Sequence, residues 1–535
     1  MIKTIPELLN QTQKNRGQGI AIVDRTNSVS YTEFEERVHR LACGLKAQGL
    51  KKGDLVGIWL PNITAYLEFF CACGYLGVTV VSVNTKFKSF EMSDIVSRSN
   101  CKMLILWPDF KNIPFLDILS EIPDGELQGL ESVVFYTEGE PFPSEIPSCI
   151  SDKRIISYRD LVDTEPTELP AVAEDDGLVI FTTSGTTGKP KFVFHHHHSI
   201  VQHAYDVASN FEFDKRACRL LQVNPLCGTF GLTQALAGLS SGATVYCVAV
   251  FNGGEAARIM TEEKITDVFG SDDMFSMMLA NTEGSNPFPD LQYAGFAAFN
   301  PALTQLVADA DKKNVKLVGL WGMSEVQAFV AHQDPKAPIE ERRLGGGKLM
   351  SDAAEIRITD PETGNRLPIG EKGELEIRCP SQMAGYLGNP EATKKTITSD
   401  GFIRTGDLAI QTDDRHFTFL SRMGDVLRLG GYLTDPVEIE SCLKDHPSVE
   451  KAQVVGVESD KGARAFAFVI LKQGALWQEE EVSAFCKSRL AGYKVPAGFE
   501  VLEAFPTTLS ANGEKVQRSK LREQAQNLWS QKGAN

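Results

Sequence analysis

A stretch of small polar residues and lysines at positions 182–191, TTSGTTGKPK, has the composition of a loop that holds phosphate. Glycine lets backbone N–H groups approach a phosphate closely, hydroxyl side chains add donors, and lysine adds positive charge. The stretch is not a Walker A loop, because its glycines are too closely spaced and Pro190 follows Lys189 where that motif has Ser or Thr. The proline also opposes an immediate helix, so we expect the loop to connect two strands. The alternative is an exposed hairpin, since Ser, Thr and Gly are common in turns.

Further short motifs follow one another along the chain. In order, they are SYTEFEERVHRLACGL at 30–45, VGIWLPN at 56–62, WGMSE at 321–325, IRTGDL at 403–408, SRMGDVLRLGGYLTDPVEIE at 421–440, GYKVP at 492–496 and NGEKVQR at 512–518. With the loop at 182–191, this series resembles the adenylate-forming superfamily, which includes acyl-CoA synthetases, firefly luciferases and the adenylation domains of peptide synthetases. The resemblance covers nearly the whole chain, and it is strongest to the fatty-acid or aromatic-acid CoA ligases. Several motifs in order are more specific than any one of them.

The resemblance implies a two-step reaction on a small-molecule carboxylic acid, with ATP, Mg²⁺ and coenzyme A as cofactors. A carboxylate is a poor electrophile, so the family first forms an acyl-AMP anhydride and releases pyrophosphate. A thiol then attacks the carbonyl carbon and expels AMP. No enzyme nucleophile is needed, so catalysis rests on positioning and charge stabilisation.

The resemblance also implies roles in nucleotide binding for the motif residues. The 182–191 loop would hold the β- and γ-phosphates, and Trp321 would stack on adenine where the family usually has tyrosine. Ser324 would donate to the α-phosphate, Glu325 would bind Mg²⁺, and Asp407 would accept hydrogen bonds from the ribose hydroxyls. The full set of nucleotide- and coenzyme-binding candidates is Thr183, Ser184, Gly185, Thr186, Thr187, Lys189, Trp321, Ser324, Asp407, Arg422, Gly430, Gly431 and Lys515.

Lys515, Thr187 and Glu325 are the catalytic candidates, and Glu325 is also the metal ligand. By the resemblance, Lys515 would reach the α-phosphate and the substrate carboxylate and stabilise charge as the oxygen attacks. Each motif residue taken alone has a structural alternative: Trp321 could lie in the core, Asp407 in a turn and Lys515 on an exposed helix. The ordered series of motifs favours the catalytic interpretation.

The family's C-terminal domain rotates between the two half-reactions, and this chain departs from the family at the pivot. The family generally has Asp or Lys two residues after the motif arginine, here Arg422, whereas this chain has Gly424, and Ser421 replaces the usual preceding glycine. Glycine can absorb a large change of backbone angles, so we expect rotation without a side-chain latch. Gly430 and Gly431 lie where the backbone would pass close to the thiol arm of coenzyme A.

Four consecutive histidines, 195–198, follow the loop. Imidazole binds zinc, copper and nickel, but consecutive residues of an extended segment point to alternate faces, so four in a row cannot easily surround one ion. The resemblance instead aligns His197 with a family histidine and Ser199 with a family asparagine. We therefore expect one histidine, His197, in the wall of the active site and local variation at the others.

The segment NPLCGTFG at 224–231 departs from the family pattern Pro-Leu-Phe-His-x-x-Gly. Cys227 and Gly228 replace the aromatic residue and the histidine at the carboxylate entrance, so we expect a more open entrance, or one filled by Phe230, Phe299 or a repacked neighbour. Cys227 has no evident base and fits a buried apolar residue better than a nucleophile. The candidate substrate-binding residues, which favour an acid with a hydrophobic tail or ring, are His197, Cys227, Gly228, Phe230, Phe269, Gly270, Phe299, Gly319 and Met323.

Alternating helix and strand patterns predict an α/β fold for the part of the chain that positions these residues. Residues 30–54 have the apolar spacing of a helix, and LVGIWLPN at 55–62 indicates a buried strand. The alternation continues to VKLVGLWG at 315–322, whereas 108–170 are rich in proline and acid and are expected to form loops. Short alternating strands from residue 371 indicate a small β-rich piece.

A helix–strand–strand–helix pattern at 436–490 predicts a separate α+β domain. We therefore expect a large N-terminal adenylation domain, 1–423, that binds ATP and the acyl group. A small mobile domain, 424–535, would carry the lysine and serve the thioester half-reaction.

The composition limits the classes of partner. The chain has 535 residues and a net charge of −16, which predicts two or three domains and disfavours nucleic acid and anionic membranes. Eleven cysteines without a CxxC pair predict a reduced, cytoplasmic protein. The uncharged run at 69–85 is too short and polar for a spanning helix and predicts a buried helix followed by a strand, with no stable membrane insertion. The N-terminal segment is too polar for a signal peptide.

The leading interpretation is an ATP-dependent acyl-CoA synthetase, and a homodimer is a candidate for its oligomeric state. Transfer of the acyl group to a carrier protein, an amine or an oxygen is an alternative, because the first half-reaction is the same; no carrier domain follows the lysine motif. A nucleotide-binding protein with decayed catalysis is another, but Glu325, Asp407, Arg422 and Lys515 are intact. A metal-binding protein built on the histidine run is the third.

Overall fold

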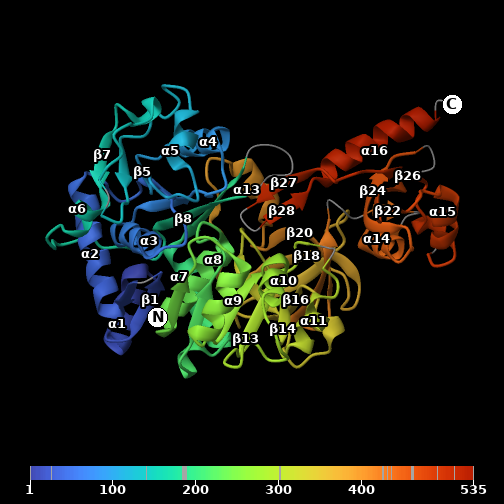
Figure 1. Cartoon of the computed structure of the whole chain (residues 1–535), viewed down its shortest axis with the longest axis horizontal. Helices are drawn as coiled ribbons and strands as arrows, with labels where there is room; N and C mark the ends of the chain where they lie inside the picture. Colours follow the sequence, from blue (N-terminus) through green and yellow to red (C-terminus); the bar gives the residue numbers. More distant parts are fainter. Residues whose placement is uncertain are drawn as a thin grey trace. The chain divides into compact units, whose positions relative to one another are not determined.

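A computed structural model describes the chain apart from a few short stretches (Figure 1). Outside the description lie residues 1, 26, 140, 184–189, 301–302, 424–426, 430–431, 435, 460–462, 491, 511–512 and 534–535, and the side chains of 428, 432–433, 509–510, 513–515 and 532–533. The chain divides into two compact units. The first consists of Met1–Phe299, Leu303–Glu355 and Arg378–Ile403, and the second of Asn300–Ala302, Ile356–Ile377 and Arg404–Asn535.

The first unit contains two mixed sheets. One runs in the order β19-β9-β8-β4-β3-β5-β6-β7. Within it, the six strands from β8 to β7 in this order pair in parallel. Its strands are β3 (Leu55–Trp59), β4 (Thr79–Ser82), β5 (Met103–Leu106), β6 (Ser132–Phe135), β7 (Arg154–Ser157), β8 (Gly177–Thr182), β9 (Phe192–His196) and β19 (Gly385–Tyr386). Parallel strands need crossover connections, which the helices supply, and the α/β prediction is confirmed.

The other sheet includes, in order, β16-β15-β14-β13-β12-β10-β11-β1-β2. These strands are β1 (Ile20–Asp24), β2 (Asn27–Ser30), β10 (Arg219–Gln222), β11 (Thr244–Cys247), β12 (Asp267–Ser271), β13 (Tyr293–Ala297), β14 (Leu317–Met323), β15 (Gln327–His332) and β16 (Gly346–Leu349). Strands β10 to β14 are parallel, and β14 to β16 form an antiparallel meander. The motif WGMSE therefore lies at the C-terminal end of β14, and residues 269–270 lie in the C-terminal half of β12. Sheets of α/β proteins usually bind ligands at these ends of their strands.

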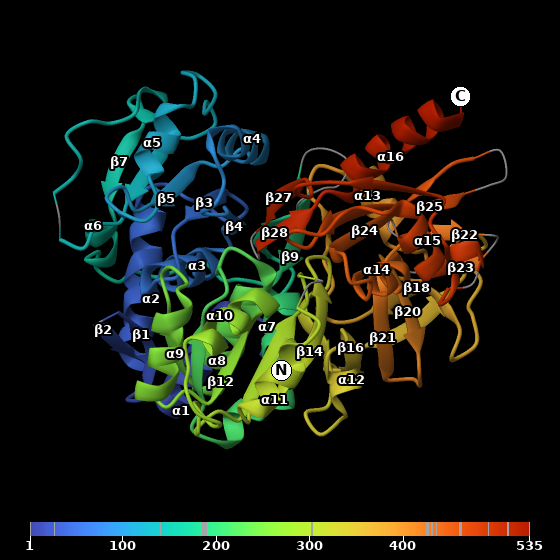
Figure 2. The same ribbon diagram turned by 45° about the vertical axis from the view of Figure 1, so that its right-hand side comes forward.

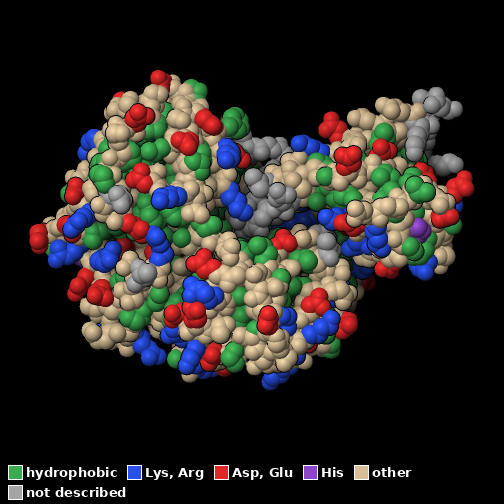
Figure 3. All heavy atoms as spheres, in the orientation of Figure 1, with side chains coloured by type: hydrophobic (Ala, Val, Ile, Leu, Met, Phe, Trp, Pro, Cys, Tyr) green, Lys and Arg blue, Asp and Glu red, His purple; other side chains and the backbone are tan. Residues whose placement is uncertain are grey.

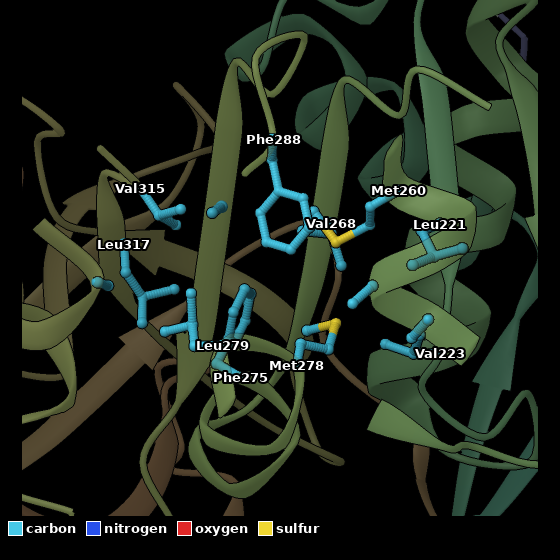
Figure 4. Close-up of a cluster of buried hydrophobic side chains, with 14 of the residues drawn as sticks. Leu221, Val223, Met260, Val268, Phe275, Met278, Leu279, Phe288, Val315 and Leu317 are labelled. Atoms are coloured by element: carbon cyan, nitrogen blue, oxygen red, sulfur yellow. The ribbon is translucent and has the colours of Figure 1, made fainter. Parts of the chain in front are cut away.

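Helices pack on these sheets and bury a large apolar core. The helices are α1 (Ile5–Arg16), α2 (Tyr31–Ala47), α3 (Thr64–Leu76), α4 (Ser89–Ser99), α5 (Phe115–Ser120), α6 (Tyr158–Val162), α7 (His197–Asn210), α8 (Thr229–Ser241), α9 (Gly253–Glu262), α10 (Asp272–Ala280), α11 (Leu306–Lys312), α12 (Ile339–Arg342) and α13 (Pro390–Thr396). Figure 4 shows part of this core, where Phe275 and Met278 of α10 face Val268 of β12 and Leu317 of β14. Such burial is the main favourable contribution to folding.

Most elements that the sequence predicts for the first unit are present. Helix α2 begins at a capping box formed by Ser30 and Glu33. The uncharged run 69–85 is a buried helix, α3, followed by the buried strand β4, as predicted. The expectation of loops at 108–170 is wrong in part, because α5, β6, β7 and α6 lie there. Strand β6 has the sequence SVVF, a run too short to stand out within a proline- and acid-rich stretch, and it pairs with β5.

The second unit combines a β-rich piece with an α+β domain. The β-rich piece predicted from residue 371 contains β17 (Glu355–Thr359), β18 (Lys372–Arg378), β20 (Ile403–Gln411) and β21 (His416–Arg422). The remaining elements are β22 (Leu427–Leu429), β23 (Tyr432–Thr434), α14 (Pro436–Lys444), β24 (Val449–Val457), β25 (Arg464–Leu471), α15 (Glu479–Lys487), β26 (Gly498–Val501), β27 (Thr507–Ser510), β28 (Gly513–Val516) and α16 (Arg518–Gly533). The helix–strand–strand–helix pattern is confirmed, whereas the boundary at 424 stays a prediction.

Alternation along β24 explains how the sheet β24-β25-β26 is covered on both faces. Val454 packs with Ile439 of α14 and Val482 of α15, whereas Val455 packs with Leu521 of α16. Successive side chains of a strand point to opposite faces, so α16 lies on the face opposite α14 and α15 (Figure 2).

None of the described helices has the length and apolar character needed to cross a bilayer. On the face of the first unit that Figure 3 shows, acidic and basic side chains are interspersed rather than gathered by sign.

Candidate active site

The candidate phosphate loop lies at the tip of a β-hairpin. Strands β8 and β9 are antiparallel, and the Thr183 N–H donates to the Lys191 carbonyl at 3.1 Å where the hairpin leaves the sheet. The prediction that this loop connects two strands is therefore confirmed. Ser184, Gly185, Thr186, Thr187 and Lys189 lie outside the described residues, so their contacts with phosphate stay predictions.

A chain of side-chain contacts connects the base of this loop to Glu325. The Lys191 ammonium group lies 4.6 Å from the centroid of the Tyr386 ring, and the Tyr386 hydroxyl donates to Glu325 Oε1 at 2.7 Å. Tyr386 lies opposite Val193 in the pairing of β19 with β9. Burial and the Glu325 charge raise the pKa of Tyr386, so the phenol stays protonated and remains a donor.

The environment of Glu325 suits a hard divalent cation. The residue is buried, its carbonyl accepts a hydrogen bond from the Met383 N–H at 2.7 Å, and no described residue bonds its Oε2 atom. The Tyr386 phenol orients the Glu325 carboxylate through Oε1, and Oε2 can then hold Mg²⁺ together with phosphate oxygens. The residues present therefore fit the implied Mg²⁺, with Glu325 as the protein ligand.

The turn that carries Ser324 and Glu325 is held from both sides. Gly322 packs so tightly on the returning strand that an added Cβ would lie 2.6 Å from the Gln327 carbonyl oxygen. Gln327 itself adopts the left-handed region with φ of 68°, and its amide donates to the carbonyls of Ser199 at 2.8 Å and Ser381 at 3.2 Å. A strained backbone maintained by buried hydrogen bonds is typical of functional sites.

The aromatic residue of the same motif, Trp321, is 6% exposed, and it lies opposite Ala331 in the pairing of β14 with β15. Protein atoms therefore enclose most of the Trp321 ring, as expected if Trp321 is a core residue. Stacking of Trp321 on adenine stays a prediction, and it requires only the part of the ring that is exposed.

The histidine in contact with this motif is His195 rather than His197. Its Nε2 atom lies 2.8 Å from the Ser324 carbonyl oxygen, and the ring is fully buried. His197 is also buried, but its Nδ1 accepts a hydrogen bond from the Ile5 N–H of α1 at 3.2 Å. His197 therefore helps to hold the N-terminal helix in place, and its role in the wall of the active site stays a prediction.

We predict that His195→Ala lowers the rate of the acid-dependent reaction by about tenfold and raises the Mg²⁺ concentration needed for half-maximal rate. The imidazole donates to the Ser324 carbonyl, and losing that bond frees the turn that presents Glu325. Initial rates at a series of Mg²⁺ concentrations measure both effects. His416→Ala is the control, since it removes an exposed histidine of the second unit that pairs with Asp413. A slower enzyme with an unchanged Mg²⁺ dependence would contradict the positioning role.

Burial lowers the pKa of both His195 and His197 to about 4, and this predicts acid sensitivity of the fold. Histidine in an unfolded chain has a pKa near 6.5, so the unfolded state binds more protons between pH 6.5 and 4 and stability falls as the pH falls. At pH 5.5 each histidine should cost about 1 kcal/mol relative to pH 7.5. His197→Asn keeps an acceptor for the Ile5 N–H and should reduce this loss. Urea unfolding of both proteins at the two pH values measures the difference; an equal loss in both would contradict the assignment.

The candidate acyl-pocket residues separate into two groups. Phe269 is 1% exposed and packs against Phe211 and Phe329 at ring-centroid distances of 4.8 and 5.0 Å, and Phe230 lies 4.9 Å from the same Phe329 ring. A Cβ on Gly319 would lie 2.0 Å from the Leu344 carbonyl oxygen. These three positions pack against the sheet and its neighbours, and their contact with the acyl group stays a prediction.

The second group lies on segments that polar side chains hold in place. Asn62 bonds the backbone of the 224–226 segment in both directions, which fixes the approach to Cys227 and Gly228. Burial raises the pKa of the Cys227 thiol to about 11, which agrees with a buried apolar role. The remaining members are Gly270, where an added Cβ would make ordinary contact with Met274, Phe299, whose N–H donates to Asp272, and the half-buried Met323.

In the second unit, Asp407 and Arg422 form an ion pair across neighbouring strands. They are register partners on β20 and β21, and Arg422 Nη1 lies 2.9 Å from Asp407 Oδ1. Asp407 is 1% exposed, and its own N–H donates to Thr405 Oγ1 at 3.0 Å. Lys515 lies on β28 opposite Thr508, and its side chain is outside the described atoms.

Other expectations for the second unit stay predictions. Gly424, Gly430 and Gly431 lie outside the described residues, so the pivot and the approach to the thiol arm are untested. The ribose role of Asp407 is likewise untested, although a buried carboxylate oriented by Arg422 is an acceptor of fixed geometry.

Sequence reasoning missed Tyr386, Gln327 and Asn62. Each acts through a partner that is far away in the chain, as with the separation of 61 residues between Tyr386 and Glu325. The one available local signal was the polar Asn62, three residues after the end of the buried strand β3, in the motif at 56–62.

The chain matches known proteins over most of its length. The family model described as AMP-binding enzyme matches residues 9–387, and the one described as AMP-binding enzyme C-terminal domain matches residues 438–512. A mitochondrial medium-chain acyl-CoA ligase of Mus musculus, ACSF2, is 29% identical over 97% of this chain and 87% of its own.

Solved structures show the same fold. The ATP-bound MatB of Rhodopseudomonas palustris has a TM-score of 0.81 at 22% identity and covers 99% of this chain and all of its own. The O-succinylbenzoate coenzyme A synthetase MenE of Bacillus subtilis, in complex with ATP and magnesium ion, has a TM-score of 0.78 at 25% identity over 96% of this chain and 98% of its own.

Proposed function

Because the chain belongs to the AMP-binding enzyme family, we propose that it is an AMP-forming ligase that joins a carboxylic acid to coenzyme A. The observation that carries this proposal is the connection, within the first unit, of the phosphate-loop hairpin to Glu325 through Lys191 and Tyr386. The arrangement brings a lysine-bearing hairpin and a metal-binding carboxylate to one place. Binding and activating a nucleoside triphosphate requires both the positive charge of lysine and a carboxylate that holds a metal ion.

The proposed reaction proceeds in two balanced steps. In the first, a carboxylate oxygen of the substrate attacks the α-phosphorus of ATP, the bond from that phosphorus to the oxygen that bridges to the β-phosphorus breaks, and pyrophosphate leaves. In the second, the coenzyme A thiol attacks the acyl carbon of the acyl-AMP, loses its proton, and expels AMP. Mg²⁺ supplies charge neutralisation for the phosphates when it is bound.

The residues of this chain orient the reactants rather than react covalently. Glu325 would hold the cation, Ser324 would donate to the α-phosphate, and His195 and Gln327 would keep the turn in place. Cys227 takes no part as a nucleophile, since burial raises its pKa to about 11.

We propose a substrate with a hydrophobic tail or ring. The packed rings of Phe230, Phe269 and Phe329 form an apolar surface that supports this proposal. An apolar wall contributes to binding in proportion to the ligand area that it removes from water.

Pyrophosphate release with a panel of short, medium, long-chain and aromatic acids, with and without coenzyme A, tests the proposal. We expect release that depends on one class of hydrophobic acid, with AMP and acyl-CoA formed in equal amounts when coenzyme A is present. Turnover that ignores coenzyme A but responds to an amine or a carrier protein would move the acceptor to those classes. The absence of release with every acid would favour a nucleotide-binding protein without catalysis.

A cytoplasmic location and a homodimer are further proposals. All eleven cysteines are buried and unpaired, which suits a reducing compartment. Fractionation of cells and light scattering of the purified protein test the two.

A further inference from the structure

The second and fourth histidines of the run lie together, apart from the first and third. Along β9, His195 is buried while Phe194 and His196 are half-buried, as alternation in a strand requires. The rings of His196 and His198 have centroids 5.8 Å apart. Strand β9 ends at His196 and helix α7 begins at His197, so the change from strand to helix brings the rings of His196 and His198 together.

A turn that precedes β8 adds a carboxylate to this pair. The N–H of His198 donates to the Glu174 carbonyl at 3.0 Å, and the N–H of His197 donates to the Asp176 carbonyl at 3.1 Å. These two bonds fix the residue between them, Asp175, beside the first turn of α7. The His198 Nδ1 atom lies 3.1 Å from the Glu174 carbonyl oxygen and 3.3 Å from Asp175 Oδ1. One ligand atom from each of Asp175, His196 and His198 lies within 4.8 Å of the others.

An acidic cavity gives a cation access to this cluster. Asp175 and His198 belong to the lining of a cavity of about 820 Å³. Its other charged lining residues are the carboxylates Glu174, Asp206, Glu212 and Asp352 and the lysines Lys3 and Lys348. Carboxylates outnumber lysines, and Lys3 is itself paired with Glu174, so the local field attracts cations.

We propose that Asp175, His196 and His198 bind a divalent transition-metal ion of the Zn²⁺ type, at a site separate from that of Mg²⁺ at Glu325. Imidazole and carboxylate are ordinary zinc ligands, whereas Mg²⁺ prefers oxygen alone. Three protein ligands leave a position for water. Zinc–ligand bonds of about 2.0–2.2 Å require the three atoms to approach more closely than they do now. Asp175 is 78% exposed, so it can turn toward the ion at little cost.

The bound ion would join the turn before β8 to the start of α7. It would thereby connect the two ends of the hairpin that carries the phosphate loop, and it would stabilise the folded state because the unfolded chain does not hold the three ligands together. This site does not depend on the proposed ligase activity.

Zinc titration of the full chain tests the proposal. The protein is stripped with a chelator and dialysed, and Zn²⁺ alone is titrated in competition with a chromophoric chelator, without nucleotide. We expect one tightly bound ion per chain, weakened about 100-fold in His196→Ala and in His198→Ala and about tenfold in Asp175→Asn. The matched control is His416→Ala, which removes an exposed histidine that pairs with a single carboxylate, Asp413.

Two results would overturn the site. One is unchanged zinc affinity in His196→Ala and His198→Ala. The other is an equal loss in His416→Ala, which would show weak binding spread over surface histidines. Thermal unfolding midpoints of the apo variants confirm that they fold, and added Zn²⁺ should raise the midpoint of the parent protein and of His416→Ala but not that of the double variant His196→Ala/His198→Ala.

The absorption spectrum of the Co²⁺-substituted protein identifies the ligands. All eleven cysteines are buried, so we expect d–d bands without a thiolate charge-transfer band. A thiolate band would place the ion on cysteine and would contradict the assignment.

Discussion

Lys515→Ala will lower the rate of acid-dependent pyrophosphate release by about 100- to 1,000-fold, and it will lower the rate at which supplied acyl-AMP reacts with coenzyme A by less than about tenfold. In the first half-reaction, negative charge accumulates between the attacking carboxylate and the α-phosphate, and an ammonium group at that position stabilises it. The second half-reaction has an uncharged acyl carbon as its electrophile, so the same ammonium group matters less.

The two half-reactions are measured separately by pyrophosphate release in single turnover and by thioester formation from synthetic acyl-AMP. Lys520→Ala is the control, because Lys520 is an exposed lysine of the same C-terminal segment, on α16. Equal losses in both half-reactions of Lys515→Ala would contradict the assigned role, and so would a comparable loss in Lys520→Ala.

Asp407→Ala will weaken ATP binding by about 100-fold while leaving the protein folded. A carboxylate that accepts two ribose hydroxyl hydrogen bonds contributes about 1.5–3 kcal/mol for each bond to a charged group, and part of this is lost by competition with water. Asp407 is 1% exposed and paired with Arg422, so its oxygens are oriented before ATP binds. Arg422 is 52% exposed and can be hydrated when its partner is removed.

Equilibrium binding of ATP by calorimetry measures this loss, and urea unfolding of the same samples shows whether folding has changed. The control is Asp414→Ala, an exposed aspartate in the turn between β20 and β21. ATP affinity that is unchanged in Asp407→Ala, with the fold intact, would remove Asp407 from the ribose site.

Local patterns were sufficient to predict the elements because burial acts on one element at a time. The capping box of α2 and the helix–strand–strand–helix order at 436–490 follow from side-chain periodicity and capping. Strand β6 was missed because four apolar residues are too few to form a period, and its place depends on pairing with β5.

The functional site was predictable only where residues adjacent in sequence act together. The prediction that the four histidines share one extended segment is wrong from His197 onward, because helix α7 begins there. The contact of His195 with Ser324 joins residues that are 129 positions apart, so no local pattern reveals it. The contact of Tyr386 with Glu325 depends on how distant strands come together, and no local pattern records it.

The fate of a carboxylate oxygen tests the central claim most directly. The preferred acid from the panel is labelled with ¹⁸O at both carboxylate oxygens and incubated with ATP, Mg²⁺ and coenzyme A, and the products are analysed by mass spectrometry. The proposed mechanism predicts one ¹⁸O atom in AMP, one retained in the acyl-CoA and none in pyrophosphate, because the attacking oxygen leaves with AMP when the thiol displaces it. Label in inorganic phosphate or pyrophosphate, or unlabelled AMP alongside acyl-CoA, would contradict activation through an acyl-AMP.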